Sequence, residues 1–156
     1  MRLTICLTLA CLLLAGCDEI FYAGLDPTST ADLPVFDFGK REDLSGSAKL
    51  YGFYVTGRPL DTAAWTTFWD IHVDDGKRYS TVDRLGYGEL PPDFHVAQYP
   101  ESLPSNYVFM GHGGFHGLGR DCWFEITADS TGQRSIVPLT EDEFQRITNQ
   151  DGSGGK

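Results

Sequence analysis

The sequence predicts a mainly β fold: a compact antiparallel sandwich or partly open barrel of about seven strands, with one short C-terminal helix. Short runs rich in β-branched and aromatic residues recur from residue 49 to residue 137, and Gly, Pro and Asp separate them. Only the stretch after them carries a helix signal. A chain of 156 residues is long enough for one domain of this kind.

The predicted strands span residues 49–56, 66–73, 77–82, 95–99, 106–111, 121–128 and 133–137. We expect 66–73 and 77–82 to form a hairpin, because the Asp75-Gly76 pair between them accommodates the positive φ angles of a tight turn. Residues 129–132 (DSTG) are expected to form the turn between the last two strands.

The helix is predicted after Pro138. Thr140 and Glu143 form a capping box, in which each side chain accepts a hydrogen bond from the other residue's backbone amide. Phe144 and Ile147 make an apolar pair at i and i+3. A helix of about ten residues is not stable alone, so this one is expected to pack on the sheet.

The N-terminus carries a processing signal. Arg2 precedes an apolar run that is too short to span a bilayer and ends in Leu14-Ala15-Gly16-Cys17. This ending resembles the lipobox of bacterial lipoproteins at every position. The resemblance implies cleavage before Cys17, diacylglycerol on its sulfur and an acyl chain such as palmitate on the new amino terminus. Two or more buried acyl chains, at about 0.8 kcal/mol per CH₂, give stable anchoring.

The predicted organisation has four parts. Residues 1–16 are the signal peptide that is removed, and 17–47 are the lipidated cysteine and an acidic tether rich in Asp, Ser, Thr and Pro. Within the tether, Val35-Phe36-Asp37-Phe38 is the one stretch that could dock, as a short edge strand. Residues 48–150 form the β-rich domain, and 151–156 are a flexible tail.

The charge balance limits the partners. Removing residues 1–16 takes away one basic and no acidic residue, which leaves 11 basic and 22 acidic residues and a formal charge of −11. Such a surface disfavours nucleic acid and anionic lipid headgroups, so the acyl chains must hold the protein on the membrane. Cys122 is the only cysteine left beside the modified Cys17, so no intramolecular disulfide is expected.

The stretch MGHGGFHGLG, residues 110–119, combines five glycines with two histidines. It does not match a dinucleotide fingerprint or a P-loop, and a strand follows it rather than a helix. His112, His116 and Cys122 could ligate zinc or copper. However, Cys122 shares a strand face with Phe124 and Ile126, which favours a core position. We therefore expect 111–119 to be a mobile connection between strands, without an ion.

Two further sets of residues are candidates for function. Asp70 and His72 share one face of 66–73 and could form an acid–base pair, but no nucleophile motif lies near them. Tyr87, Phe94 and Phe115 are predicted to lie in irregular segments, where they could contact a partner or ligand. Alternatively, these three rings fold back as plugs over the ends of the sandwich.

Three segments, YGELPPDF, NYVFMG and CWFEIT, together resemble small uncharacterised bacterial lipoproteins, a resemblance that supports the β fold and implies no activity. Asp18 after Cys17 resembles the inner-membrane retention signal of some Gram-negative bacteria. We expect a lipoprotein anchored to the inner or outer membrane of the cell envelope, with its domain on the extracytoplasmic side. It would bind another envelope protein or a small ligand, without enzymatic activity or a cofactor. The alternatives are a zinc- or copper-binding envelope protein that uses 111–119, and a hydrolase with an unrecognised site.

Overall fold

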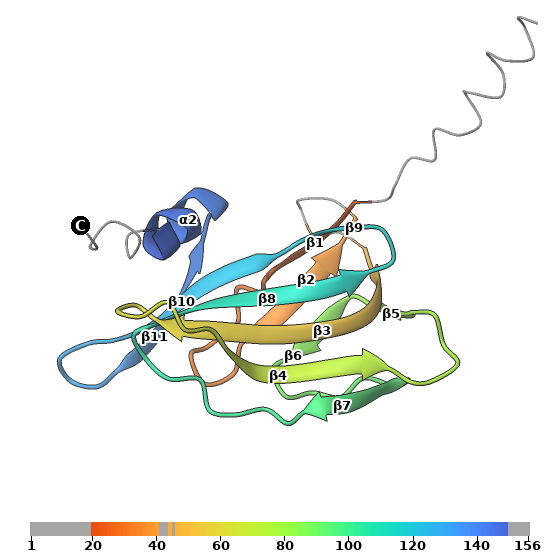
Figure 1. The fold of residues 1–156 in the computed structure, drawn as a ribbon, viewed down its shortest axis with the longest axis horizontal. Coiled ribbons are helices and arrows are strands. Elements are labelled where there is room, and N and C mark those ends of the chain that lie inside the picture. The colour runs from red at the N-terminus through yellow and green to blue at the C-terminus, as the bar shows by residue number, and fades with distance from the viewer. Residues whose placement is uncertain (1–19, 41–43, 45, 150–156) are drawn as a thin grey trace, which may run out of the picture.

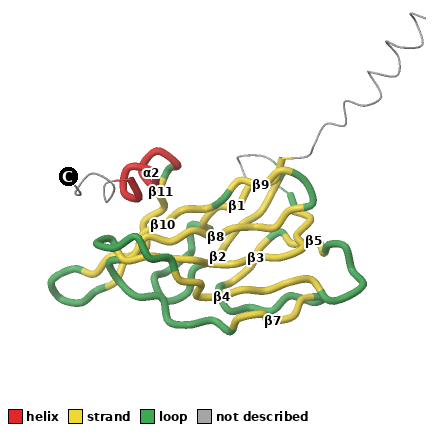
Figure 2. The backbone as a smooth tube through the Cα atoms, viewed as in Figure 1, coloured by secondary structure: helices red, strands yellow, loops and turns green. Residues whose placement is uncertain are grey.

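The structure is a computed structural model that describes residues 20–40, 44 and 46–149. The lipobox with Cys17, and the tail 151–156, lie outside the described residues. The described chain forms two β-sheets and one short C-terminal helix, α2, so the predicted mainly β fold is confirmed. Figure 2 shows that strands make up most of it, and the sheets do not close into a barrel.

The larger sheet is antiparallel and has seven strands. Its order is β11 (Arg134–Leu139), β10 (Cys122–Ala128), β8 (Tyr107–Phe115), β3 (Ala48–Pro59), β4 (Thr66–Val73) and β7 (Phe94–Gln98), and β5 (Ser80–Val82) also pairs with β3. In Figure 1 the long strands β8, β3 and β4 run side by side across the molecule.

The smaller sheet contains part of the predicted tether. Its order is β6 (Arg84–Gly86), β2 (Val35–Gly39), β1 (Ile20–Leu25) and β9 (Leu118–Arg120), with β1 and β9 parallel. Phe21, Phe36 and Phe38 are fully buried, so the tether prediction was wrong for residues 20–40. A few large rings at alternate positions bury enough apolar surface to hold both strands in the fold despite their polar surroundings. In addition, β2 lies inside this sheet and not at its edge.

The core lies between the two sheets and is rich in phenylalanine. Phe36 and Phe38 from β2 pack against Phe53 from β3, with ring centroids 4.8 and 5.3 Å apart. Phe21 from β1 stacks on Phe115 from β8 at 5.7 Å. Rings from both sheets therefore interdigitate, and the opposite face of the larger sheet is free for other contacts.

The predicted hairpin of 66–73 with 77–82 was wrong. The turn itself forms, since Lys77 donates to the carbonyl of Asp74 and Gly76 has φ 88°. Beyond the turn, however, β5 pairs with β3, and β4 pairs instead with β7. With these pairings both Val82 on β5 and Phe94 on β7 are buried in the core. If β5 paired with β4 instead, it would take the place of β7 beside β4.

The glycine-rich stretch is a strand and not a mobile loop, so that prediction was also wrong. β8 continues to Phe115, and only residues 116–117 separate it from β9. A Cβ atom at Gly111 would lie 3.0 Å from the ring of Phe53, and one at Gly113 would overlap the ring of Phe115. These glycines thus make room for aromatic rings of the core over the strand backbone.

Helix α2 (Glu141–Asn149) begins with the predicted capping box. The amide of Thr140 donates to Glu143 Oε2 over 2.8 Å, and the amide of Glu143 donates to Thr140 Oγ1 over 3.3 Å. Phe144 packs between Trp65 and Trp123, with ring centroids 5.9 and 5.7 Å away. The helix thereby covers part of the larger sheet on the side opposite the core. It is too short to span a membrane, and the described residues contain no helix that could.

Candidate functional site

The uncovered part of that outer sheet face carries a row of ionisable side chains, which we call the His–Asp row. It consists of Asp121, His112, Tyr54, Asp70, His72, His95 and Asp74. Strand alternation places the members that lie on β3 and β4 there, because their neighbours Phe53, Val55, Trp69 and Ile71 point into the core. Asp74 and Asp121 lie just outside strands and pair with His95 and His112. Four adjacent strands, β8, β3, β4 and β7, therefore contribute to one surface (Figure 1).

His112 and Tyr54 form the centre of the row. The Nδ1 atom of His112 lies 2.6 Å from Oδ1 of Asp121, and its ring centroid lies 4.7 Å from that of Tyr54. The hydrogen bond with Asp121 raises the pKa of His112 by stabilising the imidazolium, against the effect of burial. Burial raises the pKa of Tyr54, and the charges of Asp121 and Asp70 add to this effect.

The other half of the row lies on β4 and β7. The Nε2 atom of His72 is 3.2 Å from Oδ1 of Asp70, and Nδ1 of His95 is 3.3 Å from Oδ1 of Asp74. The two imidazole rings are cross-strand neighbours, with centroids 6.1 Å apart. A Cβ atom at Gly52 would lie 2.8 Å from Nδ1 of His72, so the glycine lets this ring lie against β3.

Each of the three imidazoles in the row has a carboxylate partner, and the side chains remain partly exposed. Such a surface offers both donors and acceptors at fixed spacing, which suits a polar ligand or the polar side chains of a protein partner.

The three candidate metal ligands are not brought together. His112 is paired with Asp121, whereas the ring of His116 contacts that of Tyr79 at 5.1 Å. The predicted core position of Cys122 is confirmed, since it is 4% exposed and burial raises its pKa to about 12. Across residues 20–40, 44 and 46–149, no group of three or more His, Cys, Asp or Glu side chains could hold a metal ion.

The three aromatic residues predicted to bind a partner or ligand differ in how deeply they are buried. Phe94 and Phe115 are buried, so the interpretation that they contact a partner from surface loops was wrong for both. Tyr87 is half-buried, and its hydroxyl lies 2.7 Å from the carbonyl oxygen of Glu101. Burial raises the pKa of Tyr87. The rings of Phe94 and Phe115 fit the alternative in which these aromatics close the core.

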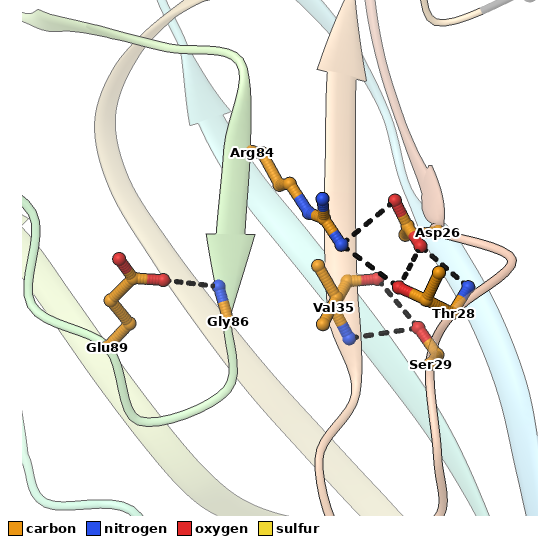
Figure 3. Close-up of polar contacts among 7 residues, drawn as sticks. All are labelled: Asp26, Thr28, Ser29, Val35, Arg84, Gly86 and Glu89. Atoms are coloured by element: carbon orange, nitrogen blue, oxygen red, sulfur yellow. Dashed lines mark hydrogen bonds and ion pairs between the residues drawn. The ribbon is translucent and has the colours of Figure 1, made fainter.

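A second polar cluster lies on the smaller sheet, beside a cavity. Figure 3 shows the guanidinium of Arg84 facing Asp26, 3.2 Å away, and Thr28, whose Oγ1 accepts a hydrogen bond over 3.0 Å. Burial raises the pKa of the neighbouring Asp37, and the charge of Asp26 adds to this effect. The open cavity measures about 420 Å³ and is lined by Leu33, Val35, Arg84, Gly86, Tyr87 and Glu89. Because Arg84 is already paired with the β1–β2 turn, this cluster primarily stabilises the turn.

Sequence reasoning singled out His112, and separately Asp70 with His72, but it missed Tyr54, Asp121 and Asp74. Alternation within each predicted strand could have placed Tyr54 opposite Phe53 and Val55, on the outer face. Strand order and register could not be predicted, and these decide that the side chains are neighbours. Comparison of the chain with family models, with curated proteins and with solved structures gave no match.

Proposed function

We propose that the protein is a lipid-anchored lipoprotein of the bacterial cell envelope, whose β-sandwich is a non-covalent binding or accessory module. The lipobox Leu14-Ala15-Gly16-Cys17 carries this proposal, because it directly follows an apolar segment of signal-peptide length. Acyl chains on Cys17 would hold the domain on the extracytoplasmic side of the inner or outer membrane.

The His–Asp row supports the binding role. Its side chains come from four neighbouring strands of one sheet and from residues directly beside them, and sites on such scaffolds hold their geometry better than sites on loops. The partner we propose is another envelope protein or a small polar ligand. The chain's formal charge of −10, or −11 without residues 1–16, makes nucleic acid an unfavourable partner.

The zinc- or copper-binding alternative has less support. It needs ligands that converge, whereas His112 and His116 make separate contacts and Cys122 is buried. We therefore keep recognition by the His–Asp row as the proposed role.

The anchor is tested by mass spectrometry of the protein purified from membranes of its host. We expect cleavage before Cys17 and the added mass of a diacylglycerol and an acyl chain. Cys17→Ser should abolish the modification and leave an unprocessed precursor. Cys11→Ser, which changes a cysteine of the apolar run outside the lipobox, is the matched control and should be processed normally. Normal lipidation of Cys17→Ser would refute the anchor.

The binding surface is tested by photo-cross-linking in intact cells. Tyr51 is exposed on β3 beside the row, so a photoreactive residue there should capture the partner. Leu60, exposed where β3 ends, is the control position. The product at residue 51 should disappear when His72→Ala and His112→Ala are combined. Equal amounts of cross-linked product at both positions would contradict the proposed surface. So would a product at residue 51 that is unchanged by the two substitutions.

A further inference from the structure

We infer that the end of the sandwich where β1 begins rests on the lipid bilayer, with Ile20 and Leu118 in contact with the interfacial region. This inference rests on the proposed lipid anchor and adds to it an orientation of the domain. Ile20 and Leu118 are register partners at the start of the parallel strands β1 and β9. Figure 1 shows these two strands together at the upper edge of the molecule, where β1 begins.

The length of chain between anchor and domain supports this contact. Cys17 and Ile20 are three positions apart, and three extended residues span at most about 11 Å. A cysteine with its acyl chains in the bilayer sits at the level of the headgroups, a layer roughly 5–7 Å thick on each side. The first residue of β1 cannot then move far from the membrane, and the domain is held against it.

The side chains at this end suit a lipid interface. Ile20 is 38% exposed and Leu118 is 55% exposed, although both are aliphatic. Nearby, the exposed ring of Tyr79 lies 5.5 Å from the ammonium group of Lys49. The ring of His116 contacts the ring of Tyr79, and the backbone amide of His116 donates to the carbonyl of Lys49. His116 thus connects Tyr79 and Lys49 to the turn before Leu118.

Aliphatic side chains flanked by tyrosine and lysine are typical of a membrane interface, where rings lie at the headgroup level and long amines reach water. The acidic surface of the chain gives no general attraction to anionic lipid, so apolar insertion close to the anchor is the contact that the chemistry favours.

The test uses the full, lipidated protein in phosphatidylcholine vesicles that contain a phospholipid with a nitroxide on its headgroup. An environment-sensitive fluorophore is attached at Leu118→Cys, and the matched control is Leu60→Cys. Leu60 is also partly exposed, but its amide bonds to Asn106 just before β8 begins, whereas Leu118 follows the other end of that strand. The nine residues of β8 span about 30 Å. Cys122 is buried and should not react with the label.

We expect loss of fluorescence at position 118 and none at position 60. Equal quenching at both positions, or none at 118 in protein whose lipid is confirmed by mass, would overturn the orientation and leave the anchor standing. Protection of the label at 118 that depends on protein concentration, without lipid quenching, would overturn it in favour of a second copy of the chain. Wild-type protein without lipid on Cys17 would overturn both the anchor and the orientation.

Discussion

The imidazole of His112 and the carboxylate of Asp121 meet at 2.6 Å, and this contact raises the pKa of the histidine. Asp121→Asn should therefore lower the pKa of His112 toward the ordinary value of about 6.5. The measurement is an NMR titration of the His112 ring in the chain from Asp18 onward. Asp74→Asn, which alters the partner of His95, is the control and should leave the His112 titration unchanged.

The same contact predicts a pH dependence of stability. The pKa of His112 is higher in the folded state than in the unfolded state, because Asp121 favours the charged ring. The stabilisation that this pair provides is therefore fully present below the unfolded pKa of about 6.5. This contribution is lost as the pH rises through the folded pKa. Urea unfolding should show the largest difference between wild type and Asp121→Asn at about pH 5.5 to 6. A difference that grows above pH 8 would contradict the assignment.

Gly113 is predicted to be intolerant of any side chain. A Cβ atom there would overlap the ring of Phe115, which is buried in the core, so Gly113→Ala should lower the free energy of unfolding by about 1–3 kcal/mol. Gly86→Ala is the matched control, because its nearest neighbour is the flexible end of Glu89 at 3.1 Å. Urea denaturation of both variants measures the difference. Equal stabilities would show that Phe115 does not occupy the space over Gly113.

Arg58 is predicted to hold helix α2 on the sheet. It is 1% exposed and donates hydrogen bonds to the carbonyls of Ile147 and Thr62. Arg58→Met should leave these acceptors poorly satisfied and cost about 1–3 kcal/mol of unfolding free energy. The exposed Arg84, changed to Met, should cost about 1 kcal/mol or less. The prediction fails if both substitutions lower stability equally.

Zinc and copper(I) should not stabilise the domain. Binding to the folded state at 100 times Kd would add about 2.7 kcal/mol, which a thermal melt detects easily. The separate surroundings of His112, His116 and Cys122 predict no change in Tm for the chain from Asp18 onward. A rise in Tm that disappears when both histidines are replaced by alanine would support the metal-binding alternative instead.

Local signals in the sequence were reliable where short-range chemistry decides the structure. The capping box of Thr140 and Glu143 involves residues three apart, and it forms as predicted. The turn at 129–132 likewise joins β10 to β11, with Asp129 accepting hydrogen bonds from the amides of Thr131 and Gln133. Alternation also placed Cys122 in the core correctly.

Composition gave a wrong prediction where a few large buried side chains decide the structure of a mostly polar segment. The region around β1 and β2 is acidic and rich in turn residues, yet Phe21, Phe36 and Phe38 anchor it in the core. The glycines of residues 111–119 also led to a wrong prediction, that of a mobile connection. At Gly111 and Gly113 their role is to admit neighbouring rings, and no local rule distinguishes this from a flexible loop.

The β class and the capped helix follow from local patterns in the sequence, and the proposed anchor is motivated by the resemblance of residues 14–17 to a lipobox. The tertiary structure alone decided which strands are neighbours, because register depends on burying distant apolar residues together. That pairing joins β5 to β3 instead of β4, and it brings Tyr54, His112 and Asp70 from three strands onto one face. The candidate site exists only through these long-range contacts.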